Sequence, residues 1–457
     1  MGSGVDSGVN SGVNRNERIM KNGKVAVIGA GPSGLSACKA LAEKGIDFDC
    51  LEAGQGVGGI WDVERGIGGG YRSLETNTST RSMSFSDFPF PKDHTPYGSA
   101  SQMLAYFESY AKHFDLFAHI EFGQRVEKAT PSPDGGWRLE LAGGEAREYA
   151  AVVAATGQYN FPKRPHEETP GTFAGEILHV FDYLDPSTPV DCRDKTVVVV
   201  GLGSSGAEIA TELSDPEHPV GSAGHLILSA RSGRWVMPKL SGGAPADARA
   251  PHPATPLPAL LRWLPGEAAP WLMRRVFGKM LRRTWDKFGG SEGLGLPKPT
   301  IEPWEDRPTL SVDFIPALKA GRIDVRSGIK RFEGSTVHFD DGSQVDADVI
   351  LYATGYQLDF PYLDRDVLGC DAPDLALYQR IAHPEHDGLF FVGCCRVMCS
   401  LWPLAEQQSK WVARAVAGDF ELPDAGKRTK KAVPLATTLP VMCNAYVEDL
   451  RREAGRF

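Results

Sequence analysis

A glycine-rich turn, GAGPSG at residues 29–34, follows a short apolar run and precedes apolar residues at helical spacing. A dinucleotide-binding turn needs this pattern. The first glycine permits a tight bend, the second lets the backbone approach a pyrophosphate, and the third lets the helix pack on the strand. The free N–H groups and the positive dipole end of that helix would face the phosphate. The residues expected to line this first phosphate site are Gly29, Gly31, Pro32, Ser33 and Gly34.

An acidic residue, Glu52, ends the next apolar strand, DFDCLEA. A carboxylate at this place accepts hydrogen bonds from ribose hydroxyls and repels a 2′-phosphate, so the first site should hold FAD or NAD rather than NADP. A second glycine pair, Gly58–Gly59, and Trp61 follow directly. The pair would bring the chain close to a ligand, and the indole would form a flat apolar wall. This favours FAD, because its flavin extends beyond the first strand–helix–strand unit.

A second turn, GLGSSG at residues 201–206, follows the apolar run TVVVV and opens another predicted helix. The strand after that helix, HLILSAR, ends in a serine and an arginine instead of an acid. A hydroxyl and a guanidinium suit the 2′-phosphate of NADP, so this second site is predicted to bind NADPH. The residues expected to contact NADPH there are Gly201, Gly203, Ser204, Ser205, Gly206, Ser229 and Arg231.

Two unlike nucleotide sites in one chain imply hydride transfer from NADPH to FAD. Two apolar runs, at residues 152–159 and 349–356, each end in Ala-Thr-Gly. Small residues at strand ends would let the chain pass from one domain to the other and back. Thr354 and Gly355, at the end of the second run, are therefore counted among the cofactor-binding residues.

The sequence thus predicts an α/β fold with two Rossmann-like dinucleotide-binding domains, the NADPH-binding domain being inserted into a discontinuous FAD-binding domain. The predicted segments are a flexible leader at residues 1–22, the FAD-binding domain at 23–164 and 345–440, the NADPH-binding domain at 165–344, and a C-terminal tail at 441–457.

The segment between the two turns carries Phe173, Gly175, His179 and Tyr183 at regular spacing. This pattern resembles the fingerprint of the flavin-containing monooxygenase family. Two further stretches share the resemblance: ETNTST at residues 75–80 with MSFSDFPFP after it, and SLWPLAEQQSKWVARAVAGD, which is similar to the family's flavin-side helix. The glycine of a linker between two cofactor sites would permit close approach, its aromatic residues would anchor the ends, and its histidine would fix the geometry.

The resemblance implies an FAD- and NADPH-dependent class B monooxygenase that uses O2. In the family, reduced flavin and O2 give a C4a-hydroperoxyflavin, which oxygenates a soft nitrogen or sulfur, while NADP⁺ stays bound. The substrate would be a small amine, thioether or indole-like compound. The resemblance also implies a catalytic role for Asn77, whose amide can donate and accept. Asn77 and Thr78 would face the flavin and the nicotinamide. The site must then supply a dry, apolar cavity rather than an acid or a base.

Alternatives of other classes stay open at this point. A Baeyer–Villiger monooxygenase acting on ketones would share the layout, although the related enzymes carry Trp where this chain has Tyr183. An NADPH-dependent FAD reductase or electron carrier would also share both nucleotide sites. A flavin disulfide reductase is disfavoured, because no cysteine pair has the spacing of a redox-active disulfide.

The composition excludes several function classes. Asp plus Glu outnumbers Lys plus Arg, 58 to 49, and the net charge of −9 disfavours a nucleic-acid binder. The cysteines show no CxxC pair and no zinc-ligand spacing, so we predict reduced, mostly buried thiols and no metal site. The absence of a long apolar run and of a secretory signal favours a cytoplasmic enzyme.

Residues 237–308 are predicted to form an insertion in the NADPH-binding domain, with one basic amphipathic helix. Its expected apolar face is Leu272, Met273, Val276, Phe277, Met280 and Leu281, opposite Arg274, Arg275, Lys279, Arg282 and Arg283. We favour a lid or wall of the substrate channel. Contact with a membrane surface through residues 271–285 is the less favoured alternative. A homodimer is left open.

Overall fold

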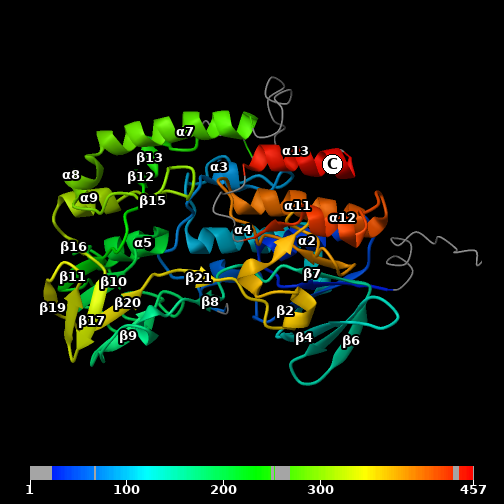
Figure 1. The fold of residues 1–457 in the computed structure, drawn as a ribbon, viewed down its shortest axis with the longest axis horizontal. Coiled ribbons are helices and arrows are strands. Elements are labelled where there is room, and N and C mark those ends of the chain that lie inside the picture. The colour runs from blue at the N-terminus through cyan, green and yellow to red at the C-terminus, as the bar shows by residue number, and fades with distance from the viewer. Residues whose placement is uncertain (1–22, 66–67, 249–251, 253–267, 436–441, 456–457) are drawn as a thin grey trace, which may run out of the picture.

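The computed structural model describes residues 23–65, 68–248, 252, 268–435 and 442–455 (Figure 1). The predicted leader at residues 1–22 and part of the predicted insertion lie outside these residues. Two parallel sheets lie side by side in Figure 1 and organise the described chain. In each sheet, the central strand leads directly into one of the glycine-rich turns.

The first sheet has five parallel strands in the order β23-β7-β1-β2-β3. Its inner strands are buried along their length, as expected for strands covered on both faces. The strands are β1 (Val25–Ile28), β2 (Phe48–Glu52), β3 (Ile120–Phe122), β7 (Ala151–Ala154) and β23 (Leu389–Phe391). The strand order reverses between β1 and β7, which is where open parallel sheets bind ligands.

The second sheet repeats this plan in the order β16-β11-β10-β20-β9. Its strands are β9 (Glu176–His179), β10 (Thr196–Val200), β11 (His225–Ser229), β16 (Asp324–Arg326) and β20 (Val349–Tyr352). The reversal of strand order lies between β10 and β20. The prediction of an α/β fold with parallel Rossmann-like sheets is confirmed.

The chain joins the two sheets through paired connections. Short strands β8 (Phe161–Pro162) and β21 (Tyr356–Gln357) run antiparallel to each other. Strand β20 pairs with β10, so the second sheet extends beyond residue 344, where the predicted NADPH-binding segment ends. The chain therefore leaves the second sheet only after Tyr352.

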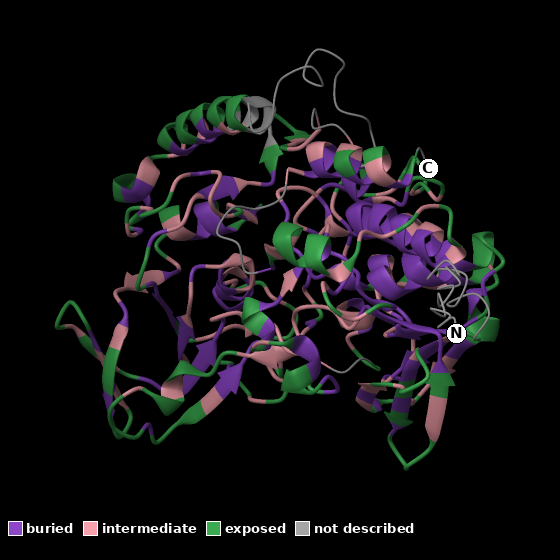
Figure 2. Cartoon of the chain, turned by 45° about the vertical axis from the view of Figure 1, so that its right-hand side comes forward, coloured by how far each residue is buried: buried purple, intermediate pink, exposed green. Residues whose placement is uncertain are grey.

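The helices pack on the parallel sheets, and one hydrophobic core cluster reaches strands of both sheets. Helix α11 packs along α2, where the hydroxyls of Ser36 and Ser409 lie 2.9 Å apart, and α13 packs on α11. Figure 2 shows α11 largely buried. The helices near the nucleotide sites are α2 (Pro32–Glu43), α3 (Thr80–Met83), α4 (Ala100–His113), α5 (Ser204–Leu213), α9 (Phe314–Lys319), α11 (Leu401–Ala417) and α13 (Cys443–Ala454).

Each parallel sheet has an antiparallel sheet attached. The first comprises β4 (Val126–Pro131), β5 (Trp137–Leu141) and β6 (Ala146–Tyr149). The second comprises β17 (Ile329–Glu333), β18 (Thr336–Phe339) and β19 (Gln344–Asp346). Strands β12 (Val236–Pro238) and β15 (Thr309–Ser311) pair where the predicted insertion leaves and rejoins the second sheet.

Helix α7 (Ala268–Lys287) forms at the predicted place, but its predicted apolar face is wrong in part. Leu272, Val276 and Met280 are exposed, beside the basic residues of the helix. Leu281 of the predicted face is buried, and Gly278 and Trp285 lie buried with it. The side chains of Met273 and Phe277 lie outside the described residues. Among the described helices, none has the length and apolar character to span a membrane.

The prediction of reduced thiols is wrong for two cysteines. Cys399, just before α11, and Cys443, at the start of α13, form a disulfide. The cysteines lie 44 positions apart, so sequence spacing gave no signal for the pair. The described free thiols are Cys38, Cys50, Cys192, Cys370, Cys394 and Cys395, all but Cys370 buried.

Candidate active site

The first glycine turn is closed by the backbone itself. Gly29 has a φ of 101°, and a Cβ there would lie 2.9 Å from the carbonyl oxygen of Ala155, at the end of β7. A Cβ on Gly34 would lie only 1.8 Å from the Gly29 oxygen, which only glycine avoids. Helix α2 starts at Pro32 with no side-chain cap, so its first N–H groups face the turn free of protein side chains. Ser33 is buried at that helix start.

Glu52 lies at the end of β2 and is held by the turn. One carboxylate oxygen accepts a hydrogen bond of 2.6 Å from the Ala30 N–H, and the other accepts one of 2.6 Å from the Gly54 N–H. The side chain is 8% exposed, so one edge remains for a ribose. This geometry fits the adenosine half of FAD.

The second glycine pair lies against the first turn. The Gly58 N–H donates to the Ala30 carbonyl at 3.0 Å, and a Cβ on Gly59 would lie 3.3 Å from the Gly31 Cα. The Trp61 ring is largely buried and meets the Trp402 ring edge-on at 5.4 Å. The indole is therefore mostly part of the core, and only a small part of the expected flat wall is accessible.

The second glycine turn has the same geometry as the first. Gly201 has a φ of 118°, and a Cβ there would lie 2.6 Å from the Ala353 carbonyl oxygen, just after β20. A Cβ on Gly206 would lie 2.0 Å from the Gly201 oxygen, whereas one on Gly203 would meet no atom within 4 Å. Helix α5 starts without a side-chain cap, and Ser204 and Ser205 at its start are partly exposed. The space next to Gly203 is open to a ligand.

The two residues predicted to recognise the 2′-phosphate behave differently. Arg231 is exposed, and no ion pair or hydrogen bond engages its guanidinium within the described part of the chain. Ser229 is buried at the end of β11, and its hydroxyl donates to the Ser327 carbonyl at 2.8 Å. Arg231 is thus free for a phosphate, while the Ser229 hydroxyl is already engaged in holding the next loop.

Asn77 lies in the loop before α3, and its amide oxygen is buried without a hydrogen-bond partner among the described residues. The loop itself is held firmly, because the Thr76 N–H donates to the Gly98 carbonyl at 3.0 Å and the Thr76 hydroxyl accepts from Gly98 at 3.1 Å. Thr78 is partly exposed beside it. A buried amide oxygen without a partner costs free energy unless a bound group supplies a donor.

The fingerprint segment forms the edge strand of the second sheet rather than a free linker, because β9 pairs with β20. A Cβ on Gly175 would lie 2.3 Å from the Asp348 carbonyl oxygen, so the close approach requires glycine. Phe173 packs on Phe332, and the Tyr183 hydroxyl donates to Glu212 at 2.8 Å. The aromatic residues therefore anchor both ends.

His179 links this edge strand to the connection after β20. Its Nδ1 accepts from the Phe181 N–H at 3.0 Å, and its ring meets the Tyr356 ring edge-on at 5.4 Å. Burial, aided by the nearby Arg164, lowers the pKa of His179 to about 4. The imidazole is therefore neutral near pH 7 and serves as a fixed contact, in agreement with a structural role.

The Ala-Thr-Gly after β20 ties the two connections together. The Thr354 hydroxyl donates to the Lys163 carbonyl at 2.7 Å, and the Lys163 N–H donates to the Gly355 carbonyl at 3.0 Å. Gly355 has a φ of 83° at this crossing. Both residues hold the crossing between the sheets in place.

Sequence reasoning missed a buried charge cluster beside the Asn77 loop. Lys239 is 1% exposed, and its Nζ lies 3.3 Å from Glu75 and 3.2 Å from Glu208. Burial raises the pKa of Glu208, which also accepts from the Tyr71 hydroxyl. These residues come from distant parts of the chain, and no local pattern in the sequence marks them.

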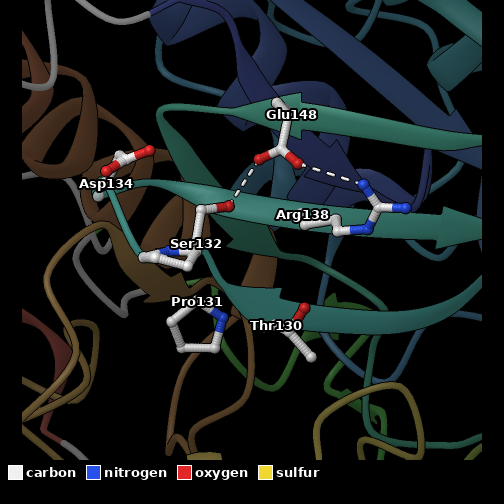
Figure 3. Close-up of a pocket in the computed structure, with 8 residues that line it drawn as sticks. Thr130, Pro131, Ser132, Asp134, Arg138 and Glu148 are labelled. Carbon is white, nitrogen blue, oxygen red and sulfur yellow. Dashed lines mark hydrogen bonds and ion pairs between the residues drawn. The ribbon is translucent and has the colours of Figure 1, made fainter.

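The surface depressions lie elsewhere. One of about 480 Å³ lies on the β4–β6 sheet beside Ser132, Arg138 and Glu148, where Glu148 accepts from the Ser132 hydroxyl at 2.6 Å (Figure 3). Another of about 440 Å³ lies along α7 beside Val276 and Met280. Neither glycine turn nor Asn77 lines either depression, so we do not assign the reaction to them.

A family model described as flavin-binding monooxygenase-like matches residues 22–434 of the chain. The chain belongs to this family. The human flavin-containing monooxygenase 2 is 32% identical over 94% of this chain and 82% of the relative. The human flavin-containing monooxygenase 1 is 33% identical over 88% of this chain and 75% of the relative. As a flavin-binding monooxygenase-like protein, the chain is an enzyme that uses FAD and NADP(H).

Solved structures share the fold of this flavin-binding monooxygenase. An S-allyl-L-cysteine S-oxygenase from Allium sativum superposes with a TM-score of 0.64 at 22% identity, covering 95% of this chain and 89% of that one. An oxidised steroid monooxygenase bound to NADP superposes with a TM-score of 0.68 at 19% identity, covering 94% and 97%. These likenesses concern the fold, which the S-oxygenase and the steroid monooxygenase share.

Proposed function

We propose that this enzyme uses NADPH and O2 to oxygenate the nitrogen or sulfur of a small, soft nucleophile. The observation that carries the proposal is the buried, unpartnered amide oxygen of Asn77. It lies in a chain whose two nucleotide sites carry unlike residues after the second strand of each unit, Glu52 at the end of β2 and Arg231 just after β11. A macaque relative, 32% identical, is described as N-oxide-forming, and the Allium enzyme of the same fold is an S-oxygenase.

The residues present fit both cofactors. The uncapped starts of α2 and α5 would receive the pyrophosphates, Glu52 the ribose of FAD, and Arg231 the 2′-phosphate of NADPH. FAD, when bound, supplies the activation of O2. The protein then has to exclude water, keep the nicotinamide in place, and offer the Asn77 amide as donor and acceptor. No side chain is required as an acid or a base.

Nitrogen or sulfur oxygenation is favoured over the two alternatives. Tyr183, where the resemblance places Trp in the Baeyer–Villiger enzymes, is tied through its hydroxyl to Glu212 on α5. A dedicated electron carrier would have no use for an unpartnered amide in a buried loop.

A stopped-flow experiment tests the reaction class. The purified enzyme should be yellow, should bleach with NADPH without O2, and should convert a thioether and a tertiary amine when O2 is admitted. Product should account for most of the NADPH consumed. Immediate reoxidation with hydrogen peroxide as the main product would favour an electron carrier, and conversion of ketones alone would favour the Baeyer–Villiger class.

The variant Asn77→Ala tests the assigned amide. Flavin content and anaerobic reduction by NADPH should stay near wild type. Product formation should fall by about fivefold to a hundredfold, since leaving a buried polar group without its partner costs about 1–3 kcal/mol. Wild-type product formation in the variant would remove Asn77 from the site.

We also propose that α7 touches an anionic membrane surface, which is the alternative that the sequence favours less than a lid. Trp271, Leu272, Val276 and Met280 are exposed on the same helix as several basic residues, and such helices bind anionic lipid. Vesicles with phosphatidylserine should sediment the wild type but not Val276→Asp, whereas neutral vesicles should sediment neither. Equal sedimentation of both proteins would leave α7 as a channel wall.

A further inference from the structure

The loop that carries Asn77 belongs to the first nucleotide-binding segment, yet charged side chains of the second segment hold it from both ends. At one end, Glu75 accepts from the Lys239 ammonium at 3.3 Å. At the other end, Asp247 accepts from both the N–H and the hydroxyl of Ser79 at 3.0 Å. Asn77 lies midway between these two contacts in the sequence.

The first contact is anchored deep in the second segment. The Lys239 side chain is almost fully buried, and its second carboxylate partner is Glu208, on the helix that follows the second glycine turn. The Tyr97 hydroxyl donates to the Lys239 carbonyl at 2.5 Å, and the ammonium lies 5.5 Å from the Tyr97 ring centre. Removing one carboxylate from a buried ammonium is strongly destabilising. We therefore expect the Lys239 ammonium to keep both Glu75 and Glu208 as partners.

The second contact comes from the chain that follows β14 (Ala244–Pro245). Asp247 uses one oxygen for Ser79, and its other oxygen is buried without a partner. The neighbouring Ala248 accepts from Arg81, and the His252 ring contacts the Ser84 carbonyl at 2.9 Å. Asp247, Ala248 and His252 therefore contact the Asn77 loop, α3 and the residue that follows α3.

We propose that Lys239 and Asp247 are positioning residues that fix the Asn77 amide relative to the second nucleotide turn. This inference rests on the proposed function, since it assigns the two residues to the same oxygenation. Because each residue acts through the loop, its loss should move Asn77 without removing any group that binds FAD or NADPH. NADPH would still be oxidised, but the electrons would leave as hydrogen peroxide instead of oxygenated product.

The main variants are Lys239→Met and Asp247→Ala, with Lys239→Arg and Asp247→Asn as the conservative counterparts. Lys128→Met is the control with the same substitution. It removes the ion pair between Lys128 on β4 and Asp364, and both of these side chains are exposed. Glu75→Gln tests the same contact from a half-exposed partner, in case the loss of the buried lysine prevents folding.

Two readouts separate positioning from general destabilisation. Hydrogen–deuterium exchange of the purified holoenzyme should rise about tenfold at residues 75–83 in the main variants, since each loses a charge-assisted hydrogen bond. The ratio of hydrogen peroxide to thioether product should rise in the same variants. The conservative variants and Lys128→Met should stay near wild type in both. If the wild type forms no oxygenated product, the proposed function is wrong. Hydrogen–deuterium exchange would still show whether Lys239 and Asp247 hold the Asn77 loop.

A double-variant cycle decides whether the residues act through Asn77. In the Asn77→Ala background, Lys239→Met should cause no further loss of product. If the two losses multiply, or if exchange at 75–83 rises while the peroxide ratio stays at the wild-type value, Lys239 is not a positioning residue for Asn77. A lower melting temperature without a change in either readout would also overturn the proposal.

Discussion

Arg231 is the residue on which the choice of nicotinamide cofactor depends. Its guanidinium is exposed and unengaged within the described chain, and it follows the strand that ends in Ser229. The variant Arg231→Ala should raise the KM for NADPH by about tenfold to a hundredfold, because a charge-assisted hydrogen bond is worth about 1.5–3 kcal/mol. The KM for NADH should stay nearly constant. An equal rise for both cofactors would show that Arg231 has no phosphate role.

His179 gives the fold a defined response to acid. Its pKa is lowered to about 4 by burial, whereas an unfolded histidine titrates near 6.5. The unfolded state therefore gains a proton first as the pH falls. The stability that this group contributes is complete above about pH 6.5 and is lost between there and about pH 4.

The urea midpoint of the wild type should thus fall from pH 7 to pH 5, and His179→Gln should fall less. His383, whose pKa burial also lowers to about 4, contributes in the same direction in both proteins. The difference between the two proteins isolates His179. If the urea midpoints of the two proteins fall equally with pH, protonation of His179 does not contribute to the loss of stability.

The sequence predicted those site residues whose roles depend on backbone shape or on place along a strand. Gly34 and Gly175 are glycines because a Cβ would strike a carbonyl. Contacts between residues far apart in the sequence could not be predicted in this way. The Ser229 hydroxyl, predicted to contact NADPH, instead donates to the carbonyl of Ser327. Lys239 and Asp247 stayed unnoticed because their partners in the Asn77 loop are more than a hundred residues away.

At the scale of elements, the third glycine of each turn, Gly34 or Gly206, lies against the carbonyl oxygen of the first. The second glycines differ, because a Cβ on Gly31 would contact Gly59 whereas one on Gly203 would meet no described atom within 4 Å. Gly206→Ala would press a methyl group against the Gly201 oxygen at 2.0 Å, so the fold should be strongly destabilised. Gly203→Ala meets no protein atom, so the fold should keep its melting temperature while NADPH binds at least about tenfold more weakly. Both quantities can be measured by thermal unfolding with and without NADP⁺.

If Gly203→Ala binds NADPH as the wild type does, the pyrophosphate does not approach this turn. If Gly206→Ala unfolds at the wild-type temperature, the contact between helix and strand is looser than its geometry indicates.

The elements themselves were predicted well where one pattern dominates. The runs of valine and isoleucine before each glycine turn became β1 and β10, and the helices after them became α2 and α5. The face of α7 was predicted less well, because apolar residues surround much of the helix. Gly278 decided the outcome, since a Cβ there would strike the Trp304 ring, and this close approach turns Leu281 and Trp285 inward.

At the scale of the molecule, the disulfide between Cys399 and Cys443 fastens α13 to the start of α11. It closes a loop spanning 44 positions, for which loss of chain entropy in the unfolded state gives at most about 4 kcal/mol. Cys399→Ser should lower the melting temperature by several degrees, and dithiothreitol should do the same to the wild type.

Cys370→Ser is the matched control, because that thiol is free and partly exposed, and its melting temperature should stay at the wild-type value. A wild type that melts at the same temperature with and without reductant would show that the bond adds nothing to stability.

The hydrophobic core is continuous across both sheets, since one cluster contains Val25 and Val27 of β1 together with Val197 and Val199 of β10. The segment that carries the second sheet is therefore not packed independently of the first sheet. Transplanting it into another reductase, or expressing either half alone, would strip apolar side chains of their neighbours. A change of cofactor is better sought in the few residues after β2 and β11, which the shared interior leaves free to vary.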